Sequence, residues 1–238
     1  MVVEICANSY ESAYNAQIAG ATRIELCQEL ALGGITPSAG LLQKVTKELS
    51  IKTYVLIRPR SGDFTYSESE FEVMLRDIAF AKACGASGIV SGILRADNTI
   101  DEDRTKQLVT ASNGMDFTFH RAFDWTPDAK AAIATLKQLG IKRVLTSGQE
   151  NNVQNGFENL KAFKNYAGSD VIILPGGGID ATNILQFKEA GFAEVHASAS
   201  STREQLSHQI PMHDVSDVIH NKTRFSDLEK IKNLLNRA

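Results

Sequence analysis

The sequence predicts an α/β fold in which eight parallel strands alternate with eight helices and close into a single TIM-type (β/α)8 barrel over residues 1–238. Three observations predict it. A helical stretch, a glycine and a short apolar run recur in that order along most of the chain. The apolar runs, such as Val171 to Leu174, do not alternate with polar residues, which is typical of strands that are covered by helices on both faces. A chain of 238 residues also has room for eight strand–helix units of about 30 residues each.

The glycine at the end of most predicted helices has a physical reason. Helices often end in a residue with a left-handed backbone, which glycine adopts without a clash at Cβ. From Gly85 to Gly191 the successive steps between these glycines are 29, 26, 28 and 23 residues. The step of 65 residues from Gly20 to Gly85 leaves room for two units.

Short apolar runs mark the strands. All but the first and the third run begin within a few residues of such a glycine. In chain order, the runs predict strands near residues 2–6, 23–27, 53–58, 88–91, 116–120, 143–146, 171–174 and 194–197.

The segments between these runs predict the helices. Ser67-Glu68-Ser69-Glu70 fits a capping box, and Thr126-Pro127 places a proline at a first helical position. In chain order, the helices are predicted at roughly residues 9–19, 38–48, 68–84, 101–112, 128–139, 153–166, 182–190 and 225–236.

The alternative architecture is an open, doubly wound parallel sheet. Such a sheet usually carries a glycine-rich fingerprint after its first strand, and Cys6-Ala7-Asn8-Ser9 contains no glycine. The least regular stretch is residues 198–224, which we interpret as an irregular excursion before the last helix. Its histidines, His208, His213 and His220, are five and seven residues apart, which fits no familiar ligand spacing and predicts surface histidines.

Composition excludes several classes of protein. The chain is 43% hydrophobic and 22% charged with a net charge of −3, which excludes a disordered chain and argues against a basic surface for nucleic acid. No run reaches the ~18 apolar residues that span a membrane, and the first ten residues lack the basic region of a signal peptide. Three cysteines without CxxC spacing argue against a disulfide framework and against structural zinc. We therefore expect a cytoplasmic protein.

Polar residues interrupt the first two strands in the same pattern. Glu4-Ile5-Cys6 and Glu25-Leu26-Cys27 place a carboxylate and a thiol on one face of each strand, because side chains alternate along a strand. The apolar face should pack on the helices, so Glu4, Cys6, Glu25 and Cys27 should point into the barrel. Buried carboxylates need a counter-charge or hydrogen bonds.

Cationic side chains follow other strands, at the end of the barrel where active sites lie. Arg58 and Arg60 end the third strand and share a face, His120 ends the fifth, and His196 lies in the eighth. With Glu4 and Glu25, these side chains are the predicted catalytic or ligand-binding groups. The alternative is a buried ion-pair network that only stabilises the barrel.

A glycine run follows the seventh strand. Gly176, Gly177 and Gly178 would let backbone N–H groups approach an anion, and Ser198 after the eighth strand adds a hydroxyl, so these four predict a site for an anionic cofactor or phosphate group. The alternative is a tight turn that requires a positive φ. Trp125 is predicted either to cap the site or to be a packing residue or part of a homo-oligomer interface.

Several long motifs occur in an order that closely resembles the CutC family, over about residues 2 to 200. They are Glu25-Leu26-Cys27, Gly33 to Ser38, Ile57 to Phe64, Thr118 to Asp124, Leu145 to Gly148 and Pro175 to Gly178. The resemblance implies a TIM-barrel-like fold, a cytoplasmic location and a link to copper handling.

Two hypotheses about function follow. In the first, the protein takes part in copper homeostasis and binds Cu(I), which prefers thiolate ligands, at Cys6 and Cys27. In the second, it is a barrel enzyme that acts on a small anionic substrate bearing a phosphate or carboxylate. One carboxylate or His120 would then transfer protons, and Arg58 and Arg60 would clamp the anion. The expected partner is thus a metal ion or a small anion, without nucleic acid or membrane.

Overall fold

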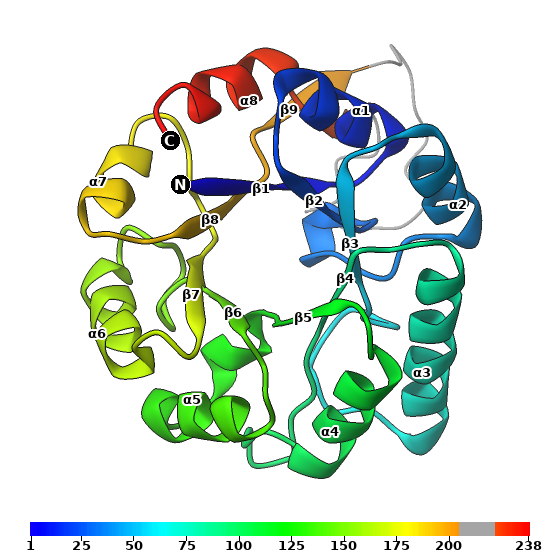
Figure 1. Cartoon of the computed structure of the whole chain (residues 1–238), viewed down its shortest axis with the longest axis vertical. Helices are drawn as coiled ribbons and strands as arrows, with labels where there is room; N and C mark the ends of the chain where they lie inside the picture. Colours follow the sequence, from blue (N-terminus) through cyan, green and yellow to red (C-terminus); the bar gives the residue numbers. More distant parts are fainter. Residues whose placement is uncertain (205–221) are drawn as a thin grey trace.

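The computed structural model describes residues 1–204 and 222–238, and these form a TIM-type (β/α)8 barrel. Eight parallel strands make an inner ring, and the helices surround it (Figure 1). The strands are β1 Val2–Ala7, β2 Arg23–Leu26, β3 Lys52–Leu56, β4 Gly88–Ser91, β5 Asp116–Phe119, β6 Arg143–Thr146, β7 Ile172–Pro175 and β8 Glu194–Ala197. The helices are α1 Tyr10–Ala19, α2 Ala39–Glu48, α3 Glu68–Ala83, α4 Glu102–Ala111, α5 Ala129–Gln138, α6 Phe157–Ala167, α7 Ile184–Glu189 and α8 Leu228–Leu235. The predicted fold class is confirmed.

The ring closes between its first, seventh and eighth strands. β1 pairs in parallel with both β2 and β8. The remaining edge, between β7 and β8, is joined by a parallel bridge between Gly176 and His196. A Cβ at Gly176 would lie 2.5 Å from Leu145 Cδ1 and 3.2 Å from His196 Cβ, so a glycine is required where these strands approach.

The two faces of the strands differ in chemistry, as the alternation predicts. Ile5, Ile24 and Leu26 belong to the large apolar core outside the ring. Cys6 and Cys27 belong instead to a small separate cluster with Tyr54, Leu56 and Val90. The ring interior is therefore a mixed polar environment, and the apolar packing that stabilises the fold lies mainly between strands and helices.

A buried network of charges fills the barrel beside this cluster. Glu194 accepts hydrogen bonds from Arg23 Nη2 and, at 2.7 Å, from Arg143 Nε. Arg23 also donates to Glu4. Both guanidinium groups lie over the ring of Tyr54, at 5.0 and 5.6 Å from its centroid. In this network each buried charge has a counter-charge, and Arg23 orients Glu4 toward the site described below.

The segment before the last helix is more regular than predicted. Ser200–Glu204 (β9) and Lys222–Ser226 (β10) pair as antiparallel strands, and α8 begins only at Leu228. The prediction of an irregular segment over residues 198–224 is therefore wrong at both of its ends, where the chain forms strands. Helix α8 cannot begin at 225, because Asp227 is its N-cap and accepts from the backbone N–H groups of Glu229 and Lys230. The predicted surface histidines, His208, His213 and His220, lie outside the described residues.

One of the two predicted helix-start signals is confirmed. Ser67 and Glu70 form the predicted capping box of α3. Pro127 is not the first helical residue, because Asp128 caps α5, which begins at Ala129. Two short 3-10 helices, Leu30–Leu32 and Arg121–Trp125, were not predicted.

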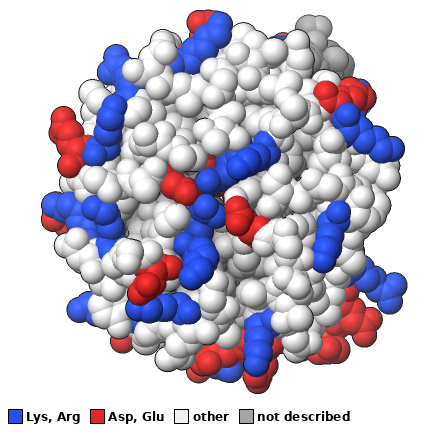
Figure 2. Space-filling view, viewed as in Figure 1, with Lys and Arg blue, Asp and Glu red and all other residues white. Residues whose placement is uncertain are grey.

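The surface carries both signs of charge. Lysine and arginine side chains are interspersed with acidic ones over the face shown in Figure 2, and neither sign forms a continuous field there. No helix in residues 1–204 and 222–238 combines the length and the apolar character needed to cross a bilayer.

Candidate functional site

A pocket of about 440 Å³ lies at the end of the barrel where the strands end. Its walls come from at least six of the strand–helix units, so the ring geometry brings together residues far apart in the sequence. The polar and charged groups that line it are Cys6, Glu25, Arg58, His120, Arg121, His196, Ser198 and Arg224.

The register of β1 against its neighbours assembles the acidic part of the site. Glu4 lies opposite His196 of β8, and Cys6 lies opposite Glu25 of β2. His196 Nδ1 is 2.8 Å from Glu4 Oε1 and 3.9 Å from Glu25 Oε2. The predicted groups Glu4, Glu25 and His196 therefore meet.

The sulfur atoms of Cys6 and Cys27 lie 3.6 Å apart, and both cysteines are buried and free. Donor atoms of Cys6, Glu25 and His196 all lie within 4.8 Å of one another. Thiolate, imidazole and carboxylate groups are metal ligands, and this arrangement is compact enough for one ion.

Burial and neighbouring charges set the protonation of this group. Burial alone would raise the pKa of Glu4, but the hydrogen bond with His196 and the charge of Arg23 lower it to about 2. Burial raises the pKa of Glu25 to about 7, against the charge of His196. Burial would lower the pKa of His196, yet its bond to Cys6 and the charge of Glu25 raise it well above its ordinary value. His196 is thus an imidazolium between two carboxyl groups at neutral pH.

The Cys6–Cys27 contact also has an electrostatic consequence. The hydrogen bond with Cys27, together with burial, raises the pKa of Cys6 well above its ordinary value. Cys6 is therefore a thiol at neutral pH, and it must lose its proton before its sulfur ligates a metal as thiolate.

Arg58 connects two loops at the pocket wall. Its Nη1 donates to the carbonyls of Leu32 and Gly34 at 2.9 and 2.8 Å, and its Nη2 donates to that of Gly62 at 2.8 Å. The side chain is buried, and its Nε has no hydrogen-bond partner among the described residues.

His120 follows β5 and is buried beside Phe64, with ring centroids 4.9 Å apart. Its Nδ1 accepts the backbone N–H of Ala122 at 3.2 Å. Burial and the charge of Arg58 lower the pKa of His120 to about 3, so the ring is neutral and its proton resides on Nε2. Within residues 1–204 and 222–238 that Nε2 has no partner.

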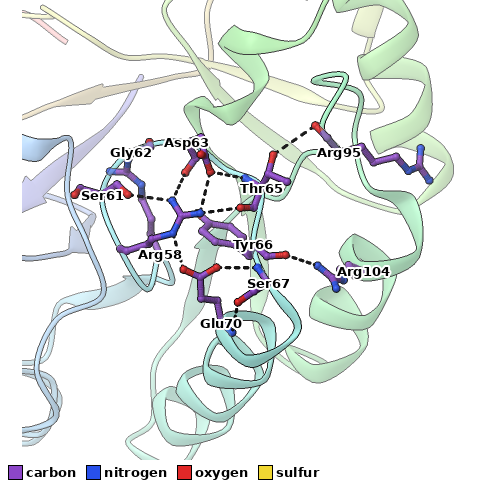
Figure 3. Close-up of polar contacts among 11 residues, drawn as sticks. Arg58, Ser61, Gly62, Asp63, Thr65, Tyr66, Ser67, Glu70, Arg95 and Arg104 are labelled. Atoms are coloured by element: carbon purple, nitrogen blue, oxygen red, sulfur yellow. Dashed lines mark hydrogen bonds and ion pairs between the residues drawn. The ribbon is translucent and has the colours of Figure 1, made fainter.

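Arg60 does not join the pocket, contrary to the predicted arginine clamp. It donates to Asp63, to Glu70 and to backbone carbonyls of its own loop, including that of Thr65. Figure 3 shows these acceptors gathered between the loop and the start of α3. The reason is that β3 ends at Leu56, so the two-residue alternation no longer applies at position 60.

Only part of the glycine run Gly176–Gly178 lines the pocket. Gly177 and Gly178 have φ of 107° and 99° and line the pocket with Ser198, whereas Gly176 lies outside the lining and makes the closing bridge. Gly178 and Ser198 also line a second cavity of about 430 Å³. Anion binding by these residues stays a prediction, as do the catalytic roles of the other site residues.

The sequence reasoning missed Arg23, Arg143 and Glu194. A signal was present, because Arg23 precedes Glu25 by two residues and Glu194 precedes His196 by two, which places each pair on one face of its strand. Cys6 and Cys27 were predicted to face inward together, and that expectation is confirmed by their contact.

The protonation of His120 predicts a loss of stability in mild acid. Below pH 6.5 the unfolded chain takes up a proton at position 120 that the folded chain, with a pKa of about 3, does not. Between pH 6.5 and 5 this linkage costs about 2 kcal/mol at 1.4 kcal/mol per pH unit. His120→Asn, which keeps an acceptor near Nδ1, should remove that part of the pH dependence. Urea unfolding at several pH values measures the free energy of unfolding of the wild type and the variant. If that free energy falls equally steeply with pH in both proteins, the low pKa of His120 is refuted.

Comparison with known proteins agrees with the motifs. The CutC family model matches residues 1–201. The chain is 45% identical over 204 residues to the copper homeostasis protein cutC homolog of Homo sapiens, covering 85% of this chain and 75% of that protein. It is 39% identical over 239 residues to a family protein CutC of Photobacterium profundum, covering 98% and 97%. A crystal structure of CutC from Streptococcus agalactiae superposes with a TM-score of 0.79 at 34% identity, covering 83% and 98%. The chain therefore belongs to the CutC family.

Proposed function

We propose that this protein acts in copper homeostasis in the cytoplasm by binding one Cu(I) ion between Cys6 and Cys27. The observation that carries the proposal is the 3.6 Å approach of the two sulfur atoms, of which that of Cys6 belongs to a residue lining the pocket. Two thiolates at this separation suit Cu(I), which prefers soft sulfur ligands. A reducing compartment would keep both cysteines free of disulfide bonds, as the site requires.

His196 fits the role of a third ligand. Its Nδ1 is bonded to Glu4, which leaves Nε2 for a metal. Metal-ligating histidines commonly donate their other ring N–H to a carboxylate in this way, which fixes the tautomer and the ring orientation. Glu4 would then be the positioning residue for His196.

Glu25 supports a cation at the same place. Its Oε2 is buried and lacks a hydrogen-bond partner among the described side chains and backbone groups. A buried carboxylate oxygen without a partner is costly, and a nearby cation would offset that cost. Since the thiols and the His196 imidazolium must release protons to bind metal, the affinity for Cu(I) should rise with pH.

The name of the human relative, a copper homeostasis protein, supports the same function. The test is anaerobic competition for Cu(I) between the reduced protein and the chelator bicinchoninate. We expect one Cu(I) per chain, with sulfur ligands visible in X-ray absorption spectra. Failure to withdraw Cu(I) from bicinchoninate, or a coordination sphere without sulfur, would reject the proposal.

A further inference from the structure

We infer that the pocket also binds an organic carboxylate, a small acid with an apolar body, whose carboxylate is held by Arg58 and His120. This goes beyond the copper proposal, because neither Arg58 nor His120 belongs to the donor set of Cys6, Cys27 and His196. It rests on three features of the pocket, namely its charge, two donors that lack partners, and its apolar rim.

The first feature is an excess of positive charge. Arg58, Arg121 and Arg224 line the pocket, and Glu25 is the one acidic side chain in the lining that the structure describes. Of these arginines, Arg121 is already paired with Asp124, which lies outside that lining. Arg58 is the most important of these charges for the argument, because its hydrogen bonds in the described chain go to carbonyl oxygens and none goes to a carboxylate. A buried charge without a counter-ion is unfavourable, so an anion in the pocket would stabilise it.

The second feature is a pair of N–H donors that lack acceptors. Arg58 Nε and His120 Nε2 are shielded from solvent, with no partner in residues 1–204 and 222–238. Both side chains pack against the ring of Phe64, with the Arg58 guanidinium 5.1 Å and the His120 ring 4.9 Å from its centroid. A carboxylate offers two oxygens to two such donors, and hydrogen bonds in which at least one partner is ionised are stronger than those between neutral groups.

The structure holds the His120 donor in place. Its Nδ1 is fixed by the Ala122 N–H, so Nε2 keeps its proton. Gly92 lies behind the ring, and a Cβ there would be 2.7 Å from Nδ1. The ring therefore has one orientation, as a preorganised binding group requires.

The third feature is the apolar rim. Trp125 is 50% exposed and Leu32 is 51% exposed, yet both line the pocket mouth. Trp125 packs edge-on against Phe64 at 5.0 Å between centroids. Large apolar side chains that are left exposed around a concave pocket fit the body of an apolar ligand. A bare inorganic anion would leave these side chains in water.

The proposal is tested by calorimetric titration of copper-free protein with 3-phenylpropanoate and with its neutral amide, 3-phenylpropanamide. We expect the acid to bind at least about 10-fold more tightly, because charge-assisted hydrogen bonds supply the difference. Equal affinities, or no binding of the acid, would overturn the proposal. Tighter binding of phenyl phosphate than of the acid would overturn the assignment of a carboxylate.

Two variants separate the role of His120 in binding the carboxylate from the role of Trp125 in contacting the apolar body of the ligand. His120→Asn should weaken the acid by about 10-fold and the amide by clearly less, because the Nε2–H bond to a carboxylate oxygen is charge-assisted and the bond to an amide oxygen is not. Trp125→Ala should weaken both ligands by the same factor. Tyr166→Ala, which removes an exposed aromatic side chain outside the pocket lining, is the matched control and should change neither. An acid preference that persists in folded His120→Asn would contradict the role of His120.

The experiments test the copper proposal and the carboxylate proposal separately, so that either one can fail without the other. Replacing Cys6 and Cys27 with serine should leave the preference for the acid over the amide intact. Loss of that preference in the folded serine variant would show that the two ligands depend on the same atoms and would overturn the separate carboxylate site.

Discussion

The variant with both Cys6→Ser and Cys27→Ser is expected to lose more than about 100-fold in Cu(I) affinity, the upper end of what removing an outer partner of a metal ligand costs. The reason is chemical, because a serine hydroxyl is a hard, neutral oxygen and Cu(I) prefers thiolate. Each single variant leaves one sulfur beside His196, so each should fall between the wild type and the double variant. Competition with bicinchoninate measures all of these affinities.

The chain provides a matched control for this experiment. Cys84 is the remaining cysteine and caps the C-terminal end of α3, outside the pocket lining. Cys84→Ser should leave the affinity and the stoichiometry unchanged. If the double variant still binds one Cu(I) per chain with wild-type affinity, the cysteine pair is not the copper site.

Replacing Glu194 with glutamine should lower the free energy of unfolding by about 3–5 kcal/mol, the usual cost of breaking a buried ion pair by removing one partner. The Glu194 carboxylate bridges two buried guanidinium groups, those of Arg23 and Arg143. A neutral amide would leave both positive charges without this counter-charge. Urea unfolding monitored by circular dichroism at pH 7 measures the change.

An exposed ion pair supplies the comparison. Glu48 pairs with Lys44 on α2, and both side chains are about half exposed. Glu48→Gln should lower the free energy of unfolding far less than Glu194→Gln, because water and salt screen an exposed pair on a helix. Similar losses for Glu194→Gln and Glu48→Gln would mean that the interior network does not stabilise the fold.

The sequence was sufficient to predict the ring of strands and the inward direction of the first site residues. Period-two alternation over the predicted strands 2–6 and 23–27 assigns Glu4, Cys6, Glu25 and Cys27 to the interior, and the structure agrees, although β2 itself ends at Leu26. That inference needs only local geometry, since a strand of four residues already fixes which side chains share a face.

The predictions that were wrong or could not be made concern loop conformation and strand register, which the alternation of side chains along a strand does not determine. Arg60 lies beyond the last residue of β3, where a loop carries its side chain toward Glu70. The strand register was also not predictable from the repeated motifs, because Cys6 lies opposite Glu25 and not opposite Cys27. Pairing depends on the shear of the whole barrel, and hence on long-range packing.

The closure of the ring through β1 and β8 has a consequence for biosynthesis. Glu4 and His196, which are 192 positions apart, cannot meet until nearly all of the barrel has left the ribosome. The sulfur pair needs only the first two strands, which are 21 positions apart at Cys6 and Cys27. Both thiols therefore leave the ribosome long before the histidine that completes their surroundings, so they are exposed to metals and oxidants during much of synthesis.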